Sequence, residues 1–371
     1  MSRTRLGILK RREPLRVGFL PVTDCAPLVY AREAGLFEKY DVEVELQRET
    51  SCAYVCAKVF EGELDAAQVP ASLPFLASLG LSADPCECIS GLVLSLQGNA
   101  IAISRRLWDQ GVLDAQSLRA QIYRRWGKQT YTFGVMFTGS TQELLLRQWL
   151  KSAGIAPGVE LRLVAIPPDQ MFPTLRLGYI DGYCVSEPWT SVAVQAGAGV
   201  CLATSADLAP LHPEQVLMVR QTFAAGRAEE HERLLAALLE ACAFCDRPNN
   251  RALVADLLAQ PHYVNAPAEC LKTGLAPARP QRTRLERSPE APIFHHHQAN
   301  EPSDTKAAWV MDNLYGLLQP TVFKSRNLER SPVLKNVFRN DIFERVKAVR
   351  REPVQPDLDA QPQEAGVVPA G

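Results

Sequence analysis

The 371-residue chain lacks a charge surplus of either sign, because 40 Lys and Arg residues stand against 41 Asp and Glu residues. A protein that binds nucleic acid mainly through its phosphates needs a clear basic excess, so direct nucleic-acid binding is not expected. Gly and Pro, at 22 and 27 residues, are too few for a low-complexity chain. At about 150 residues per domain, the length predicts two globular domains.

Long apolar runs are also missing. The first 20 residues, MSRTRLGILKRREPLRVGFL, hold five basic residues by Arg12. They contain no apolar segment of about 7 to 15 residues and no small-residue cleavage site. Two charge-free stretches, 66–83 and 188–206, are interrupted by Pro, Gln or Gly, so we interpret them as core segments. The sequence therefore predicts no membrane insertion and a cytoplasmic location, with a periplasmic one as the alternative.

Ten cysteines are present, but not at the density of a secreted disulfide framework. Most lie in apolar segments such as DGYCVSEPW and GAGVCLAT, where a reduced cysteine acts as a small apolar residue. Cys52 and Cys56, one helical turn apart, are interpreted as core residues rather than a redox pair or soft-metal site. Cys242 and Cys245 fall on a leucine stripe. Residues 295–297 are three histidines whose adjacent side chains diverge, so no metal site is predicted.

Strand and helix patterns alternate along the chain. Residues 15–20 predict a buried strand, the next apolar segment predicts a helix ending near Gly35, and 41–49 alternate apolar with charged residues in a second strand. Strand, helix and strand within about 35 residues predict parallel pairing. The strand pattern continues through 64–69 and 91–103. These features predict an α/β fold.

Two helix starts carry sequence signals. Asp24 precedes the first predicted helix and is either its N-cap or part of a pocket wall. Ser140, with Glu143 three residues later, forms a capping-box pattern. The helix that follows predicts one buried stripe, formed by Leu145, Leu146, Trp149 and Leu150.

Six segments, taken in order, resemble the solute-binding proteins of the nitrate, bicarbonate and taurine class of ABC importers, and most of all its nitrate/nitrite branch. They are GFLPVTDCAPLVYAREAGLFEKYDVEVEL, LSLQGNAIAIS, MFTGSTQELLLRQWL, IPPDQM, GYIDGYCVSEPW and HPEQVLMVR. The resemblance covers roughly residues 15–270 and resumes at FHHHQANEPSDTKAAWV and VFRNDIFERV. It implies an α/β, two-lobed, type II periplasmic-binding-protein-like fold with a ligand cleft between the lobes.

The same resemblance implies a division of the chain. Lobe one is discontinuous, and lobe two is inserted into it. The expected segments are a basic N-terminal tail (1–14), lobe one (15–102 plus 213–349), lobe two (103–212), a Pro/Arg-rich loop (273–292) and a disordered tail (350–371).

The resemblance also implies where a ligand would bind. The pocket of the nitrate/nitrite branch uses a Trp, a Gln, a His, a Gly and a Lys, which by position fall on Cys52, Asn99, Gln142, Ser186 and Gln215. All five differ, and the loss of His and Lys removes both residues that could be cationic. Amides donate hydrogen bonds but also accept them, so they suit a neutral or protonated ligand about as well as nitrate. The ligand is therefore left open between nitrate or nitrite, another small solute, and none.

Three more residues are candidates for the cleft or the hinge. Asp24 lies beside the helix start at 23–26, where free backbone N–H groups can bind an anion. Trp189, in SEPW, is expected to pack against the cleft floor or the hinge. Glu187 is a candidate polar latch between the lobes.

The resemblance finally implies a function. Its branch contains exported importer subunits and also cytosolic sensors that hold an RNA-binding antiterminator until nitrate or nitrite arrives. The absent export signal, together with Asn99, favours a sensor of a small solute or anion, without catalytic residues, cofactor or metal. One alternative is the substrate-binding subunit of an importer, which delivers to an ABC permease. The other is an enzyme that resembles thiamine-pyrimidine synthases, whose cysteine motif the CAFC at 242–245 echoes at a different position.

Overall fold

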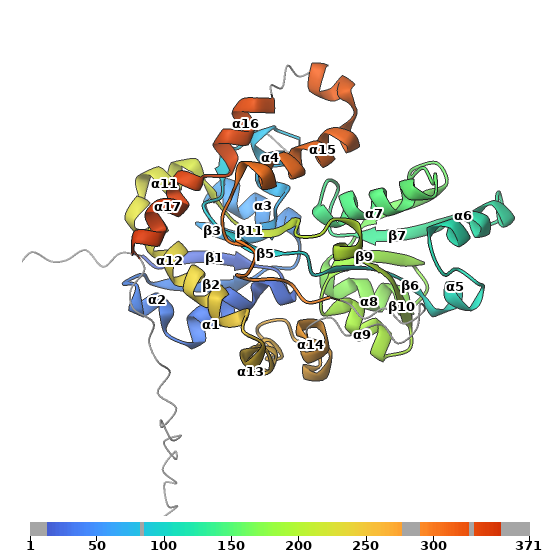
Figure 1. The fold of residues 1–371 in the computed structure, drawn as a ribbon, viewed down its shortest axis with the longest axis horizontal. Helices are drawn as coiled ribbons and strands as arrows, with labels where there is room; N and C mark the ends of the chain where they lie inside the picture. Colours follow the sequence, from blue (N-terminus) through green and yellow to red (C-terminus); the bar gives the residue numbers. More distant parts are fainter. Residues whose placement is uncertain (1–12, 82–84, 277–289, 326–329, 350–371) are drawn as a thin grey trace, which may run out of the picture.

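The computed structural model describes residues 13–81, 85–276, 290–325 and 330–349, and places them in two β-sheets covered by helices (Figure 1). The predicted tail at 350–371, nearly all of the predicted tail at 1–14 and most of the predicted loop at 273–292 lie outside the described residues. We call each sheet, with the helices that pack on it, a lobe.

The first lobe holds a six-stranded sheet in the order β2-β1-β3-β11-β4, with β5 also paired to β11. Its strands are β1 (Leu15–Phe19), β2 (Val44–Arg48), β3 (Ala66–Pro70), β4 (Cys88–Ile89), β5 (Val93–Leu96) and β11 (Pro213–Arg220). β1 runs parallel to β2 and β3, which confirms the predicted parallel opening. β11 runs antiparallel to its three neighbours, so a strand from late in the chain completes the middle of this sheet.

The second lobe holds a five-stranded sheet in the order β10-β6-β9-β7-β8. Its strands are β6 (Asn99–Ser104), β7 (Tyr131–Val135), β8 (Leu161–Ala165), β9 (Gly182–Ser186) and β10 (Gly199–Thr204). β6 pairs antiparallel with both β9 and β10, whereas β7 is parallel to β8 and β9.

Helices cover both sheets. The helices of the first part of the chain are α1 (Ala26–Glu33), α2 (Leu36–Lys39), α3 (Cys52–Glu61), α4 (Leu73–Ser78), α5 (Arg105–Asp109), α6 (Ala115–Arg124), α7 (Thr141–Ser152), α8 (Pro168–Arg176) and α9 (Trp189–Gln195). Those that follow are α10 (Ser205–Leu208), α11 (Gln221–Gly226), α12 (Ala228–Cys245), α13 (Arg251–Leu258), α14 (Ala268–Leu275), α15 (Asp304–Ser325), α16 (Arg330–Val337) and α17 (Asn340–Val349). Over the described ranges, no helix combines the length and apolar character needed to cross a membrane.

The later helices tie the lobes together. α14 packs against α9, and α15 packs against α7, so each pair joins an element from the end of the chain to the second lobe. α16 and α17 return to the first lobe, where they pack on α4 and α12. The predicted loop at 273–292 begins inside α14, which runs to Leu275.

α7 shows why its sequence forms a helix at this place. The Ser140 hydroxyl accepts a hydrogen bond from the backbone N–H of Glu143 at 3.2 Å, as an N-cap does. The Glu143 carboxylate accepts from the N–H of Gly139 rather than from Ser140, so the predicted capping box is only half formed. The predicted stripe is buried in the core of the second lobe, where removal of its apolar surface from water stabilises the helix.

The predicted strand at 91–103 is two strands in different sheets, which corrects the sequence interpretation. Gln97 and Gly98 separate β5 from β6, and both have positive φ angles, 53° and 86°. The chain returns to the first lobe through His212. There the N–H of Gln97 donates to the His212 carbonyl at 3.1 Å, and the Gln97 side chain accepts from the N–H of Leu211 at 3.1 Å. The two crossings between the lobes therefore lie side by side.

The expected lobe boundaries fall close to these crossings. The boundary at 102/103 falls inside β6, all of which pairs within the second sheet. The boundary at 212/213 coincides with the start of β11. The division of the chain into the two predicted lobes stays a prediction.

The cysteines and the histidine run have ordinary surroundings. All ten cysteines lie in the described residues and are free of disulfides, and most are buried. Cys242 and Cys245 are buried on α12, as predicted, and burial raises the pKa of both thiols. His295 and His296 donate backbone N–H groups to the Asp246 carboxylate. Across the described parts of the chain, no three His, Cys, Asp or Glu side chains are grouped as metal ligands.

Candidate functional site

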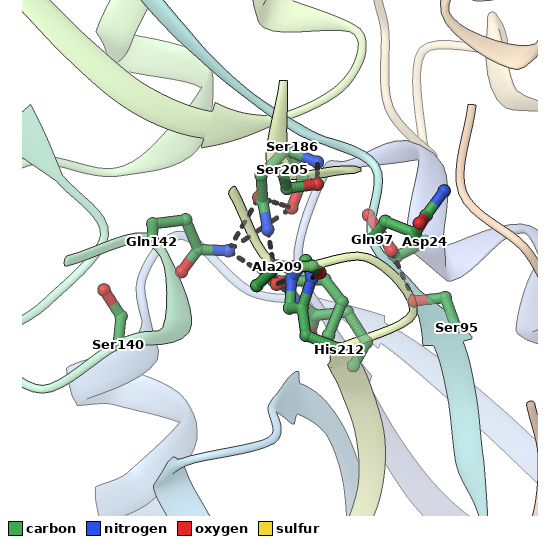
Figure 2. Close-up of polar contacts among 12 residues, drawn as sticks. Asp24, Ser95, Gln97, Ser140, Gln142, Ser186, Ser205, Ala209 and His212 are labelled. Carbon is green, nitrogen blue, oxygen red and sulfur yellow. Dashed lines mark hydrogen bonds and ion pairs between the residues drawn. The ribbon is translucent and has the colours of Figure 1, made fainter. Parts of the chain in front are cut away.

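Four of the five positions implied by the resemblance meet at the crossings between the lobes. Asn99 begins β6 and lies opposite Ser186, which ends β9, in the antiparallel register of these strands. Gln142 is the second residue of α7, and Gln215 lies near the start of β11. All four are fully buried. Figure 2 shows Gln142 and Ser186 turned toward the same centre.

Amide and hydroxyl groups connect these side chains. The Asn99 carbonyl oxygen accepts from the Ser186 hydroxyl at 2.9 Å and from the Gln142 amide at 3.1 Å. The same Gln142 amide nitrogen lies 3.4 Å from the Ser186 hydroxyl oxygen. We call these residues, with Glu214, His212 and Gln215, the crossing network.

Glu214 lies at the centre of the crossing network, and the sequence analysis missed it. Its fully buried carboxylate accepts hydrogen bonds from the amide groups of Asn99 and Gln142 and, at 3.0 Å, from that of Gln215. A carboxylate removed from water is costly unless such donors replace its hydration. The three amides therefore replace the hydrogen bonds to water that the carboxylate loses on burial.

His212 completes the surroundings of Glu214 and was also missed. Its Nδ1 lies 2.9 Å from the carbonyl oxygen of Ala209, which can only accept, so Nδ1 carries a hydrogen. Its Nε2 lies 3.2 Å from the Glu214 carboxylate. Nε2 is therefore the ring nitrogen that His212 turns toward the Glu214 carboxylate.

A second chain of amides leads from the network into the first lobe. The Gln215 carbonyl oxygen accepts from the Gln68 amide at 2.8 Å. The Gln68 carbonyl oxygen accepts from the backbone N–H of Leu20, just beyond β1, at 2.9 Å. These contacts fix the Gln215 amide so that its N–H faces Glu214.

Cys52, the fifth implied position, lies beside the network but is not part of the hydrogen bonds described above. It is the first residue of α3 and is 2% exposed. Burial raises the pKa of its thiol well above the usual range, and the neighbouring Cys56 and Glu214 raise it further. The thiol therefore remains protonated and contributes an apolar surface beside the network.

Asp24 is not a helix cap, which corrects one of the two predicted alternatives. Cys25 is the N-cap residue of α1, and Asp24 lies in the 3-10 turn η1 (Thr23–Cys25). Its fully buried carboxylate accepts from the Ser95 hydroxyl at 2.5 Å (Figure 2). Burial, with the nearby charge of Glu214, raises the pKa of Asp24 to about 8. Asp24 is thus a second buried acid at the wall of the crossing network.

A different contact joins the lobes next to Asp24, and we call it the backbone contact. The N–H and hydroxyl of Thr23 donate to the backbone carbonyl of Glu187 at 2.7 and 3.0 Å. The Trp189 indole N–H donates to the carbonyl of Pro21 at 2.9 Å. Trp189 therefore lies where the lobes meet, and its packing against a cleft floor or a hinge stays a prediction.

Glu187, the candidate polar latch, contacts the first lobe through its backbone carbonyl. Its carboxylate is fully buried and accepts from the N–H of Ser191, in its own lobe, at 3.2 Å. Burial raises the pKa of Glu187 to about 7.

Unpaired polar atoms lie at the start of α7. The Thr141 hydroxyl and the Gln142 carbonyl oxygen are buried without a hydrogen-bond partner among the described residues. Figure 2 shows the Gln142 carbonyl oxygen pointing away from the dashed contacts of the network, on the side of Ser140. A buried polar atom without a partner costs about 1–3 kcal/mol. A small polar solute held between the lobes could satisfy these atoms.

The signal that could have found Glu214 and His212 is the segment His-Pro-Glu-Gln, which leads into the apolar run of a strand. Polar side chains at the entrance of a buried strand are unusual, because each needs a partner in the interior. The sequence analysis used this segment only for its resemblance.

Comparisons with known proteins agree with this architecture. A family model described as the NMT1-like family matches residues 10–259. The nitrate/nitrite binding protein NrtA of Nostoc sp. (strain PCC 7120) is 30% identical over 260 residues, which are 68% of this chain and 58% of that protein. The crystal structure of the periplasmic nitrate-binding protein NrtA from Synechocystis PCC 6803 superposes with a TM-score of 0.82 at 22% identity, over 92% of this chain and 90% of that one. The predicted two-lobed α/β fold of periplasmic binding proteins is thereby confirmed.

Another relative is larger than this chain. The nitrate import ATP-binding protein NrtC of Synechocystis sp. (strain PCC 6803) is 37% identical over 304 residues, which are 81% of this chain but 45% of that protein. The chain thus spans less than half the length of this relative.

Proposed function

The chain belongs to the NMT1-like family, and from this premise we propose that it is a solute-binding protein of the nitrate/bicarbonate ABC-transporter type that holds a small polar solute between its lobes. The observation that carries the proposal is the crossing network. It gathers Asn99, Gln142, Ser186 and Gln215, fully buried, where the chain passes between the lobes. Burying polar side chains costs free energy, and a binding function explains why so many are gathered there.

Binding acts through the equilibrium between open and closed arrangements of the lobes. A solute that contacts both lobes stabilises the closed arrangement by its difference in affinity for the two states. Gln142 from the second lobe and Gln215 from the first are the amides that such a solute would bridge. We propose a small oxyanion such as nitrate, nitrite or bicarbonate, or a neutral molecule of similar size.

We further propose that closure is read by another protein in the cytoplasm. The similarity to a protein named as an ATP-binding import component supports this location, because ATP-binding components work where ATP is present. The printed sequence has no GxxxxGK[ST] pattern, so ATP binding is not carried over to these 371 residues. The ATP-binding component of an importer is the first candidate partner, and an RNA-binding antiterminator is the second.

The alternative is an importer subunit that collects solute in the periplasm and delivers it to an ABC permease. The fold it shares with a protein named as periplasmic supports this alternative. Fractionation of cells that express the native gene, followed by N-terminal sequencing, separates the two. A processed chain in the periplasmic fraction would establish the alternative.

An enzyme of the thiamine-pyrimidine-synthase type is not favoured. It would need reactive cysteines, whereas Cys242 and Cys245 are buried on α12 with thiol pKa values raised by burial. Iron retained after purification under reducing conditions would reopen this alternative.

The binding proposal is tested by thermal shift with nitrate, nitrite, bicarbonate, cyanate, sulfonates and pyrimidines, each against chloride at equal ionic strength. A solute specific for the folded protein raises the Tm. We expect a response that Gln142→Leu weakens and that Gln148→Leu, on the exposed side of the same helix, leaves unchanged. An unchanged Tm with every solute would contradict the proposal. A complex with either partner that responds to the solute, measured by size-exclusion chromatography, would support the sensor role.

A further inference from the structure

We propose that the Glu214 carboxylate is an internal ligand: it occupies the donors that would bind a free small oxyanion and thereby holds the two lobes together. This inference rests on the proposed function, because it concerns the same site. It adds a residue that no resemblance pointed to and a consequence for the class of ligand.

The first argument is the coordination of the carboxylate. A carboxylate has two oxygens with about two lone-pair positions each. The Oε1 atom of Glu214 accepts from Gln142 and Gln215, and its Oε2 atom accepts from Asn99 and contacts His212 Nε2. Four groups thus surround four acceptor positions. Nitrite, formate and bicarbonate present the same planar pair of oxygens, so a receptor built for Glu214 also fits them.

The second argument is where the four groups come from. Gln142 lies on α7 and Asn99 on β6, both in the second lobe, whereas Gln215 lies on β11 of the first lobe and His212 directly precedes that strand. Glu214 itself is on β11. Its carboxylate therefore makes the contacts across the lobes that a bound solute makes in a closed two-lobed protein.

The third argument is that burial alone does not produce such coordination. Glu187 is just as buried and also lies where the lobes meet, yet its carboxylate accepts one N–H, from Ser191. Its Oε1 atom has no hydrogen-bond partner among the described residues. Of these two fully buried glutamates where the lobes meet, Glu214 is the one whose two carboxylate oxygens both have partners.

A consequence follows for ligand selection. A free oxyanion reaches the amides of Asn99, Gln142 and Gln215 only after Glu214 has left them. The internal carboxylate is present at a high effective concentration, because the chain holds it beside its donors. Glu214 therefore competes with a free oxyanion for these donors, so the wild-type protein binds small oxyanions more weakly than a variant without this carboxylate.

The test removes the internal ligand. Glu214→Ala leaves a space lined by the four groups, and we expect it to bind formate and nitrite at least roughly tenfold more tightly than the wild type in calorimetry. Formate should also raise the Tm of Glu214→Ala and leave that of the wild type unchanged. Leu217→Ala is the matched control, since it removes a fully buried apolar side chain from the same strand and leaves Glu214 and its donors in place. It should gain no affinity for either anion.

Glu214→Gln keeps the test informative if the alanine variant does not fold. It preserves the volume of the side chain but points an NH₂ group at donors, so it should separate the lobes without creating an anion site. Small-angle X-ray scattering should then show a larger radius of gyration than for the solute-free wild type, while circular dichroism stays native. A radius of gyration for Glu214→Gln equal to that of the wild type would overturn the proposal that Glu214 holds the lobes together.

The outcomes separate this inference from the proposed function. Equal anion affinity in the wild type and in Glu214→Ala overturns the internal ligand and supports the binding function. Anion binding by Glu214→Ala alone supports the internal ligand, even if no member of the solute panel binds the wild type. If a folded Glu214→Ala binds no anion and formate does not change its Tm, the internal ligand is overturned. The thermal-shift panel of solutes then remains the test of the proposed function.

Discussion

The two neighbouring contacts between the lobes are built from different groups. In the crossing network, side chains bind side chains, and Glu214 is their centre. In the backbone contact, the acceptors are the carbonyls of Glu187 and Pro21. Every residue has a backbone carbonyl, so a substitution at Glu187 or Pro21 keeps the acceptor, whereas a substitution in the network removes an amide or a carboxylate. Substitutions in the network can therefore change which ligand it binds while the backbone contact continues to align the lobes.

The comparison predicts that the backbone contact carries the larger share of stability. Trp189→Ala removes a large side chain that is 6% exposed, together with its bond to Pro21, and should lower the free energy of unfolding by about 3–5 kcal/mol. Chemical denaturation measures this change. Trp126→Ala, at a 55% exposed position, is the control and should change stability by less than about 0.5 kcal/mol. Similar losses in both variants would remove the assigned role of Trp189.

The network should contribute less, and through coupling. Gln142→Leu removes one donor from the Glu214 carboxylate and should cost about 1.5–3 kcal/mol, the range for a bond to a charged group. A double-mutant cycle with Glu214→Gln should give a coupling energy of about 0.5–3 kcal/mol. Strictly additive losses would show that the two side chains do not stabilise each other.

Taken per pH unit, the smallest effect is a dependence on pH that differs between the two contacts. The pKa of Asp24 is raised from 3.8 to about 8, and that of Glu187 from 4.5 to about 7, in both cases chiefly by burial. Between about pH 4 and these values the folded chain keeps protons that the unfolded chain has released. The free energy of unfolding therefore falls as pH rises, by up to about 1.4 kcal/mol per pH unit for each group.

The two acids can be told apart by their pH windows. Between pH 7 and 8 the fall in the free energy of unfolding caused by Asp24 continues, whereas the fall caused by Glu187 has ended. Asp24→Asn should flatten the stability profile up to about pH 8, and Glu187→Gln only up to about pH 7. Urea denaturation at half-unit pH intervals measures both. Identical profiles for the two variants would mean that the acids share one environment.

Much of the fold could be predicted because its signals are local. The alternation at 41–49 and the stripe on α7 each depend on a single element, and the structure has both. The family and fold implied by six segments are confirmed. The break between β5 and β6 was missed although Gly98, with a positive φ of 86°, marks it in the sequence, because apolar strand patterns stand on both sides of it.

The centre of the network was missed for a different reason. Neighbouring residues of a regular strand point to opposite faces, so Glu214 and Gln215 are not expected to share a site. The register between β11 and β5 shifts on both sides of Gln215, and this irregularity lets the two consecutive side chains meet. Such a shift depends on the pairing of distant strands, which no local pattern reveals.

The position of β11 sets the order in which the protein can be completed during translation. β11 lies between β3 and β4 in the first sheet, yet it is made only after all five strands of the second sheet. Until Arg220 has left the ribosome, the inner edge of β3 has no hydrogen-bonding neighbour, and the nascent chain exposes a bare strand edge. The second sheet, whose strands end at Thr204, can already pair by then. The lobe whose first strands are made earlier is thus the lobe that is completed later.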